Sequence, residues 1–326
     1  MAALTSRAER SSNAEFSVII CAYTLDRWDI LSEAVTSVRT QTLPPREIIL
    51  VIDDNQDLLR RCQTELEVTL VLANRHPGGL SGGRRTGAEE ASAAILAFLD
   101  DDAIAEPRWL AKLSEAYGDP AALGAGGRVD PLWTKAPPCW LPPEFNWIIG
   151  CTYDGMPTCA GRIRNPIGAN MSMRAEVLAR TGSFAPALGR ANRGARVSGT
   201  ADETEFCIRA ARLHPGGYWA YAPEARVRHA VPPERATWRY FVRRCRLEGT
   251  AKAILTGLTG PRAGLASERA YSRSVLPRAI ARELRWAIRG HPEAALRAAT
   301  IVTGVAITVF AYGEQWGRAR WRAARA

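Results

Sequence analysis

The sequence predicts an α/β protein with a doubly wound, mainly parallel sheet, flanking helices and a helical C-terminal extension. Short apolar segments alternate with segments of helical periodicity from residue 16 onward. This alternation is typical of sheets whose crossover helices cover both faces. Polar residues directly follow three of the expected strands, and basic residues concentrate in the last third of the chain.

The strands and helices of the first third of the chain can be placed in order. Residues 16–23 (FSVIICAY) form a nearly continuous apolar run with β-branched members, typical of a strand covered on both faces. The next helix is expected from apolar residues at helical spacing, namely Ile30, Leu31, Ala34, Val35 and Val38. Further strands are expected at 47–53, 68–74 and 94–102, with a helix at 79–92.

Polar residues stand where three of these strands end. They are Tyr23 and Thr24, then Asp53 and Asp54, and finally Asp100, Asp101 and Asp102. In doubly wound sheets, ligands bind outside the carboxyl ends of the strands. The sequence therefore predicts a binding site at this edge.

The composition excludes several classes of protein. The 326 residues are 47% hydrophobic and 23% charged, which is ordinary for a globular chain and unlike a disordered or fibrous one. The seven cysteines include no CxxC pair, so we expect reduced thiols in a cytoplasmic protein rather than disulfides or a thiolate zinc site. Residues 1–15 have no apolar core of a secretory signal and are expected to be a flexible N-terminus.

The formal net charge of +10 is unevenly distributed. Residues 1–230 hold 25 basic and 27 acidic side chains, whereas residues 231–326 hold 18 basic and 6 acidic ones. A basic C-terminal region on a near-neutral body indicates an anionic partner surface, for which membrane lipid is the leading candidate. Nucleic acid ranks last, because the basic residues are not interleaved with aromatic ones in a known recognition module.

A long proline- and aromatic-rich stretch covers residues 131–165 and includes Trp133, Trp140, Phe145, Trp147 and Tyr153. Its aromatic content argues against disorder, and a loop of this length inside a domain is usually functional. We expect it to form a wall of the binding site. A flap that only covers the core is the alternative for each single aromatic residue.

Two motifs at the expected edge indicate anion and metal chemistry. Three adjacent carboxylates at 100–102 repel one another, and a divalent cation such as Mg²⁺ or Mn²⁺ relieves that cost. The alternative is a solvated acidic turn that caps the helix expected near Pro107. The segment GGLSGGRRTG (78–87) opens a helix whose free N–H groups suit an anion, and Arg84 and Arg85 add positive charge.

Two later positions are candidates for acid–base or ligand roles. Asp202, Glu203 and Glu205 fall in the first turn of an expected helix (ADETEFCIRAAR). One of them could be a general base, although the helix dipole alone favours acidic residues there. His229 lies in ARVRHAV, after a short apolar segment at 218–223, and a single histidine in such a place is more often structural than a ligand.

Taken together and in order, these motifs resemble glycosyltransferase family 2. The resemblance covers residues 16–255 and also includes PIGANMSM (166–173) and YFVRRCRLEGTAKA (240–253). It implies a GT-A fold, with a nucleotide half at about 16–130, an acceptor half at about 131–255 and a basic helical extension at 256–326. It also implies an inverting, hexosyltransferase-like enzyme that uses a nucleoside diphosphate sugar, by default a UDP-sugar, with Mn²⁺ or Mg²⁺. The acceptor hydroxyl would belong to a lipid-linked sugar, a polysaccharide or a small molecule.

The resemblance also assigns donor-binding residues. Asp53 corresponds to the residue that meets the nucleobase or ribose, with Thr24 nearby and Arg84 at the nucleotide. Asn170 corresponds to a sugar or acceptor contact. Arg85 stands where many relatives have Asn, which is a departure from the family pattern.

The metal and the base are assigned in the same way. The DXD-type motif falls on Asp100 to Asp102, with Asp102 as direct metal ligand and Asp100 or Asp101 reaching the metal or the ribose. His229 corresponds to a position that completes metal or diphosphate binding in some members. The acidic pair reads Asp-Glu where Glu-Asp is commoner, so Glu203 is the expected base and Asp202 the alternative.

The C-terminal region contains an expected basic amphipathic helix at 276–289. Four arginines lie on one face and four aliphatic residues on the other: Arg278, Arg282, Arg285 and Arg289 against Leu276, Ile280, Leu284 and Ile288. Such a helix lies in a membrane interface, or else packs on the catalytic domain with its arginines in water.

An uncharged segment of 16 residues follows at 298–313, shorter than the ~20 needed to span a bilayer. The residues beside it resemble interfacial anchors: Arg297, Trp316, Arg318, Arg320, Trp321 and Arg322. We therefore expect peripheral attachment to the inner face of the cell membrane, with a true span as the alternative.

Two other functions remain open at the level of sequence. A sugar nucleotidyltransferase would share the sheet, but its glycine-rich, lysine-containing N-terminal signature is absent here. A nucleotide-sugar-binding scaffold without catalysis is compatible with the two departures from the family pattern.

Overall fold

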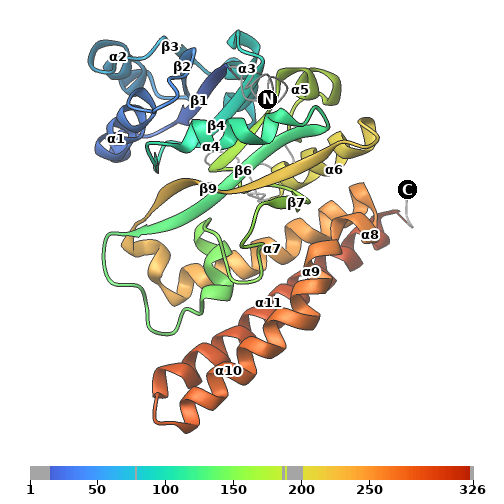
Figure 1. Ribbon diagram of the computed structural model, residues 1–326. Helices are drawn as coiled ribbons and strands as arrows, with labels where there is room; N and C mark the ends of the chain where they lie inside the picture. The colour runs from blue at the N-terminus through green and yellow to red at the C-terminus, as the bar shows by residue number, and fades with distance from the viewer. Residues whose placement is uncertain (1–14, 78, 186–187, 189–200, 324–326) are drawn as a thin grey trace, which may run out of the picture.

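The computed structural model describes residues 15–77, 79–185, 188 and 201–323. A body built around one sheet is accompanied by long C-terminal helices that extend away from it (Figure 1). Apart from Glu15, the N-terminal segment expected to be flexible lies outside the described residues. Most of the stretch between Gly182 and Ala201 does so too.

Within the described residues, nine strands form one sheet in the order β3-β2-β1-β4-β8-β6-β9-β5, and β7 pairs with β9. The strands β3, β2, β1 and β4 are parallel, as predicted. Beyond β4 the sheet is mixed, because β8 runs antiparallel to both β4 and β6 while β6 and β9 are parallel. The bounds are β1 (Phe16–Ala22), β2 (Glu47–Ile52), β3 (Leu70–Ala73), β4 (Ile95–Asp100), β5 (Ala103–Ala105), β6 (Ala122–Trp133), β7 (Gly161–Ile163), β8 (Asn170–Arg174) and β9 (Tyr218–Val231).

Strand β9 joins two segments that look separate in the sequence. The apolar residues 218–223 and the segment with His229 belong to one strand of 14 residues. The register against β6 shifts between the pairs Gly127–Ala222 and Val129–Val227. Pro223 lies in this irregular stretch, and because proline cannot donate to a ladder it is accommodated where regular pairing is interrupted.

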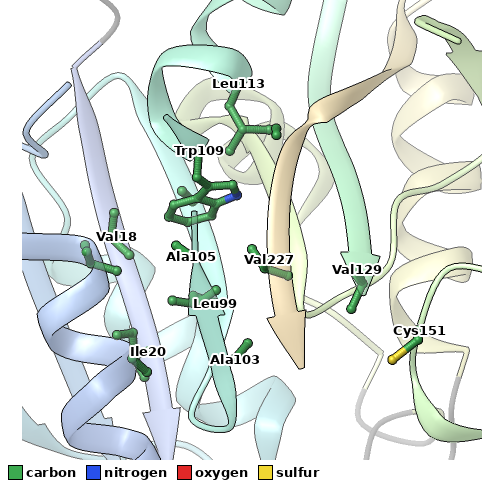
Figure 2. Packing of buried hydrophobic residues seen from close by; sticks show 14 of the residues in the cluster. Val18, Ile20, Leu99, Ala103, Ala105, Trp109, Leu113, Val129, Cys151 and Val227 are labelled. Carbon is green, nitrogen blue, oxygen red and sulfur yellow. The ribbon is translucent and has the colours of Figure 1, made fainter. Parts of the chain in front are cut away.

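Helices cover both faces of the sheet, so its central strands are buried on both sides. On β1, Val18 and Ile20 belong to one core and Ile19 to the other, as the alternation of side chains along a strand requires. Figure 2 shows the first core, in which Trp109 lies over Ala105 and Leu99. Helices α1 (Trp28–Arg39), α2 (Gln56–Glu65) and α4 (Trp109–Ser114) contribute to the first core, and α3 (Leu80–Glu90), α5 (Ala175–Thr181) and α6 (Asp202–Leu213) to the second.

Short helical turns join these elements. They are η1 (Leu25–Arg27), η2 (Glu115–Gly118), η3 (Pro143–Ile149), η5 (Pro233–Ala236), α8 (Pro261–Gly264), α9 (Ala266–Ala270) and the π-helical turn η6 (Tyr271–Val275).

The C-terminal helices form successive layers beside the body. Helix α11 (Pro292–Ala323) packs along α7 (Trp238–Thr259), and α10 (Leu276–Ile288) packs on α11 (Figure 1). Glycines allow α11 to approach its neighbours closely. A Cβ on Gly249 of α7 would lie 2.2 Å from the Thr308 carbonyl oxygen of α11, and a Cβ on Gly304 of α11 would lie 2.4 Å from the ring of Phe145. The expected domain boundary at residue 255 falls inside α7, which continues to Thr259.

An ion-pair network also fixes α10 and α11. The buried Glu283 on α10 accepts hydrogen bonds from Arg282 and from Arg297 of α11. Arg282 also pairs with the buried Glu144 of η3, at 3.0 Å. Arg297 therefore joins two helices here, which differs from the expected role of a membrane anchor.

The buried side of α10 consists of Leu276, Ala279 and Glu283, whereas Leu284 and Ile288 are exposed. The apolar face expected from the sequence is therefore divided between the protein interior and the surface. The acidic Glu283 is buried where Arg282 and Arg297 pair with it.

Candidate active site

The register of the sheet brings the polar strand ends together. Ala22 of β1 pairs with Ile52 of β2, and Cys21 of β1 pairs with Asp100 of β4. Asp53 and Asp100 therefore lie on either side of the end of β1. This is the edge at which parallel sheets bind ligands.

Asp53 is held at the first of two cavities. Its carboxylate accepts hydrogen bonds from the Gly79 N–H and from Asn74 Nδ2, each at 2.8 Å. The cavity beside it has a volume of about 370 Å³. Its lining is polar, and includes Asp54, Asn55, Gln56 and His76. Such groups can hydrogen-bond the edge of a base or the hydroxyls of a ribose.

Thr24 lies at the same edge but has a local partner. Its hydroxyl donates to Asp26 Oδ2 at 3.0 Å and accepts from the Asp26 N–H at 3.2 Å. These bonds cap the η1 turn, as threonine before a helix commonly does.

Asp100, Asp102 and His229 form a candidate metal site. One ligand atom from each lies within 4.8 Å of the other two. The pairing of β5 with β9 explains how they meet, because it sets His229 directly opposite Ala103, the residue after Asp102. The resulting distance between His229 Nε2 and Asp102 Oδ1 is 3.1 Å.

Two arginines, neither expected from the sequence, face the same carboxylates. Arg27 Nη1 lies 2.8 Å from Asp101 and 3.1 Å from Asp102, and Arg235 Nη2 lies 3.2 Å from Asp102. Burial raises the pKa of the Asp102 carboxyl, but His229 and the two arginines lower it by more, to well below its usual range. Burial and the charge of Asp102 raise the pKa of Asp101 to about 7.

These residues fit a divalent cation. Two carboxylates and an imidazole are suitable donors for Mn²⁺, and the carboxylates alone for Mg²⁺. Asp102 is ionised at neutral pH, as a ligand must be. Asp101 pairs with Arg27 rather than joining the group, so Asp100 and Asp102 are the two carboxylates of the motif that could hold a cation.

The acidic pair lies in the first turn of α6 and contacts Arg84 of α3. Arg84 Nη1 donates to Glu203 Oε1 at 2.9 Å and lies 3.8 Å from Asp202 Oδ2. Its Nη2 donates to the Gly168 carbonyl and lies 3.7 Å from Asp100. One buried guanidinium thus links the acidic pair to the candidate metal site.

The two carboxyls of the pair have opposite protonation preferences. Burial raises the pKa of Glu203, but Arg84 and the neighbouring Asp202 lower it by more, to about 2. Burial and the charge of Glu203 raise the pKa of Asp202 well above its usual value. Glu203 is therefore the member that is ionised at neutral pH, whereas the raised pKa of Asp202 favours its protonated form. The Ser81 hydroxyl donates a hydrogen bond to Asp202 Oδ2 at 2.9 Å.

Two residues expected at the donor have other partners in the structure. Arg84 is only 1% exposed, its donors are used by Glu203 and Gly168, and it does not line the 370 Å³ cavity beside Asp53. Asn170 is fully buried; its amide donates to the carbonyls of Arg128 and Ala225 and accepts from Trp109. The expected sugar contact of Asn170 is wrong for this structure, because no part of the amide reaches a surface.

A second, larger cavity of about 520 Å³ lies between the body and the C-terminal helices. Asp100, Glu203 and His229 line one part of it, and Val305, Val309 and Tyr312 of α11 line another. From the stretch 131–165, Phe145, Trp147 and Tyr153 also line this cavity, as expected of a site wall. Trp133 and Trp140 instead pack against the core, which is the alternative proposed for single aromatic residues.

Sequence reasoning missed several contributors to the site. Asn74 directly follows β3, so the rule that polar strand ends meet could have found it. Arg27 and Arg235 do not directly follow an expected strand, and nothing in the sequence distinguishes them from the other arginines among the 40 of the chain. Gly168 is required because a Cβ there would lie 2.1 Å from Glu203 Oε1, which only the folded chain reveals.

The fold is similar to that of a sugar transferase of known structure. The crystal structure of GalNAc-T7 with UDP, GalNAc and Mn²⁺ matches 72% of this chain and 48% of its own, with a TM-score of 0.51 and 18% identity. The sheet, its helices and this likeness define a GT-A type glycosyltransferase fold, as the sequence predicted.

The sequence comparisons identify the family. The model of glycosyl transferase family 2 matches residues 17–182. The glucosyl-dolichyl phosphate glucuronosyltransferase of Haloferax volcanii is 32% identical over 243 residues, covering 73% of this chain and 76% of that protein. The succinoglycan biosynthesis protein ExoM of Rhizobium meliloti is 25% identical over 235 residues, covering 69% and 70%. The chain belongs to glycosyltransferase family 2 and is a glycosyltransferase.

Proposed function

We propose that this enzyme is an inverting transferase that moves a sugar from a nucleoside diphosphate sugar, by default a UDP-sugar, to a hydroxyl of a lipid-linked acceptor. The proposal is carried by Glu203, Asp100 and His229, which line one cavity, and by the buried Arg84, which links Glu203 to Asp100 behind it. The Haloferax relative is named for a sugar on dolichyl phosphate, which supports the proposal of a lipid-linked acceptor.

Glu203 is proposed as the base. Its ionised carboxylate takes the proton of the acceptor hydroxyl while the hydroxyl oxygen attacks the anomeric carbon. The bond from that carbon to the diphosphate breaks, the nucleoside diphosphate leaves with the electron pair, and the anomeric configuration inverts. Arg84 acts through Glu203 by keeping it ionised and oriented.

The donor is proposed to span the two cavities. Asp53, with Asn74, is assigned to the base or ribose, and Thr24 marks the same edge. Asp100, Asp102 and His229 would hold Mn²⁺ or Mg²⁺ next to the diphosphate. When bound, the cation neutralises charge that develops on the leaving diphosphate. Peripheral attachment at the inner face of the cell membrane is part of the same proposal.

A base variant tests the mechanism. Glu203→Gln keeps the size of the side chain but cannot accept the proton, so we expect turnover to fall roughly 10²- to 10⁴-fold. Binding of the donor, measured by calorimetry, should stay within a few-fold of wild type. Asp202→Asn is the matched variant, and we expect a smaller effect on turnover because the raised pKa of Asp202 leaves less of it ionised than Glu203. A larger loss in Asp202→Asn than in Glu203→Gln would reverse the assignment.

A donor panel tests the metal site and the scaffold alternative. Thermal unfolding of the wild-type chain with each of several nucleoside diphosphate sugars should show a Mn²⁺-dependent rise in Tm for one donor. Asp102→Ala should abolish the rise, because it removes a ligand and the partner of His229. If wild type binds a donor but transfers no sugar from it, the protein would be a binding scaffold rather than an enzyme.

A further inference from the structure

The solvent side of α11 has no charged residue over most of its length. Between residues 295 and 313 every exposed residue is apolar: Ala295, Leu296, Ala299, Val302, Ala306, Val309, Phe310 and Gly313. We call these residues the outer face of α11. It is about 28 Å long at 1.5 Å per residue. A surface helix of a globular protein is normally polar on the side that faces water.

Helix α10, which packs on α11, also exposes apolar residues. Leu284 and Ile288 are exposed, Ile288 by 88% of its area, and they follow one another at helical spacing. Arg278, Arg285 and Arg289 are exposed on the same helix. Exposed apolar residues of this extent, bordered by basic ones, mark an interaction surface rather than ordinary protein surface.

The partner of this surface is identified by its chemistry. The apolar outer face requires an apolar phase of large area, while the exposed arginines of α10 and Arg320 near the end of α11 favour negative charge; Arg318 pairs with Glu314 of its own helix. Trp321, which is also exposed, lies beside them. An anionic bilayer offers both, with aromatic and basic side chains at the level of its headgroups.

Tertiary packing decides how the helix meets that bilayer. By length and composition, residues Pro292–Trp321 of α11 would be apolar enough to cross a membrane. The opposite side of α11, however, is buried against α7 at Gly249 and Gly304, and Arg297 pairs with Glu283. Among the described residues nothing covers the outer face, so α11 can lie along a membrane while it stays part of the folded enzyme.

We propose that the outer face of α11, together with Leu284 and Ile288 of α10, lies in the interface of an anionic lipid bilayer with the helix axis parallel to the membrane. Val309 of this outer face also lines the 520 Å³ cavity that holds Glu203 and Asp100. The cavity therefore reaches the membrane-facing helix. If the proposed function is correct, this arrangement delivers a lipid-linked acceptor from the bilayer directly to the base.

Vesicle flotation of the full-length chain tests the proposal. Wild type should float with vesicles of phosphatidylcholine and phosphatidylglycerol, and less with phosphatidylcholine alone. Val302 and Phe310 are 56% and 68% exposed and do not line the cavity, so glutamate there should preserve the fold. We expect the double variant Val302→Glu/Phe310→Glu to reduce the partition coefficient at least tenfold. The control Leu213→Glu changes an exposed leucine at the end of α6 and should float like wild type.

Three outcomes would overturn the proposal. The double variant could float as well as wild type. Wild type could remain in the membrane after alkaline carbonate extraction, which would indicate a span. Wild type could also form a dimer that Phe310→Glu converts to a monomer, which would make the outer face an interface between two copies. Asp102→Ala should float normally, so a failure of flotation is separable from a failure of the proposed catalysis.

Discussion

At the scale of the residue, the site depends on one buried guanidinium. Arg84 lies between the acidic pair and Asp100, under the rings of Phe98 and Phe184, where two carboxyl groups would otherwise be buried without a counter-charge. Three of its neighbours are acidic, so its own pKa is raised despite burial. A charge in this position can be paired only by partners that the fold brings together.

Replacing Arg84 should change both stability and the pH dependence of the reaction. Arg84→Met leaves Glu203 and Asp202 buried without their cation, and we expect a loss of about 3–5 kcal/mol in the free energy of unfolding. The pKa of Glu203 should rise, so the base would be protonated over a wider range of pH. The acid limb of the rate–pH profile should therefore move toward neutrality.

Arg84→Lys is the control for this prediction. It keeps the positive charge but cannot donate to Glu203 and Gly168 at the same time. Urea unfolding should show that the free energy of unfolding falls from wild type to Arg84→Lys to Arg84→Met. Rate–pH profiles should show the acid limb moving toward neutrality in the same order. An unchanged acid limb in Arg84→Met would show that Arg84 does not set the ionisation of the base.

At the scale of the element, the contact between α7 and α11 depends on the absence of a side chain. The two helices approach so closely at Gly249 that a Cβ would meet the backbone of Thr308 and the Cβ of Ala311. Phe145 of η3 occupies the corresponding space at Gly304, so three segments of the chain meet there. The fixed position of α11 follows from these contacts.

Two glycines of α7 provide a matched test of this contact. Gly249→Ala should destabilise the protein by about 1–3 kcal/mol, because the added methyl overlaps a backbone atom. Gly257→Ala, on the same helix, has nothing within 4 Å and should stabilise by ~0.5–1 kcal/mol through the better helix propensity of alanine. Urea unfolding of both variants checks this; a similar effect of the two substitutions would refute the close approach.

At the scale of the whole molecule, ion pairs connect the C-terminal helices to the catalytic body. Glu268 of α9 pairs with Lys252 of α7 at 2.6 Å and with Arg164, which follows β7, at 2.8 Å. All three line the large cavity. One wall of the cavity is therefore held by ion pairs, of which the Arg164–Glu268 pair joins segments about a hundred residues apart in the sequence.

This cluster predicts a component of acid unfolding. Burial raises the pKa of Glu268, but Lys252 and Arg164 lower it by more, from 4.5 to about 2. The unfolded chain then binds the proton of Glu268 more tightly than the folded chain does. The contribution of ionised Glu268 to the free energy of unfolding is therefore complete above pH 4.5 and is lost as the pH falls toward 2. Glu268→Gln should cost about 2 kcal/mol at pH 7, where it leaves Lys252 buried without its closest partner.

Unfolding by urea at a series of pH values measures this effect. The stability difference between wild type and Glu268→Gln should be constant above about pH 5 and should shrink below it. Glu293→Gln, a half-buried acid at the start of α11 beside His291, is the control and should change stability far less. A difference that grows as the pH falls would contradict the assigned direction of the pKa shift.

The sequence by itself determined the parallel strands and the acidic edge, because both depend on local pattern. Continuous apolar runs define buried strands, and parallel strands end at one edge wherever they are placed, so Asp53 and Asp100 had to lie at the same edge of the sheet. The family motifs in their fixed order determined the class of enzyme. These conclusions do not require knowledge of which side chains meet across the fold.

Only the tertiary structure decided the partners of the buried charges and the exposed side of the C-terminal helices. Arg84 and Asn170 are turned inward, Arg27 and Arg235 are brought to Asp102, and Glu283 is buried in place of Leu284. Each of these depends on pairing between distant segments, since a charge or amide is buried only where a partner compensates for the loss of water. Periodicity reports which residues share a face of a helix, but packing selects the face that is covered.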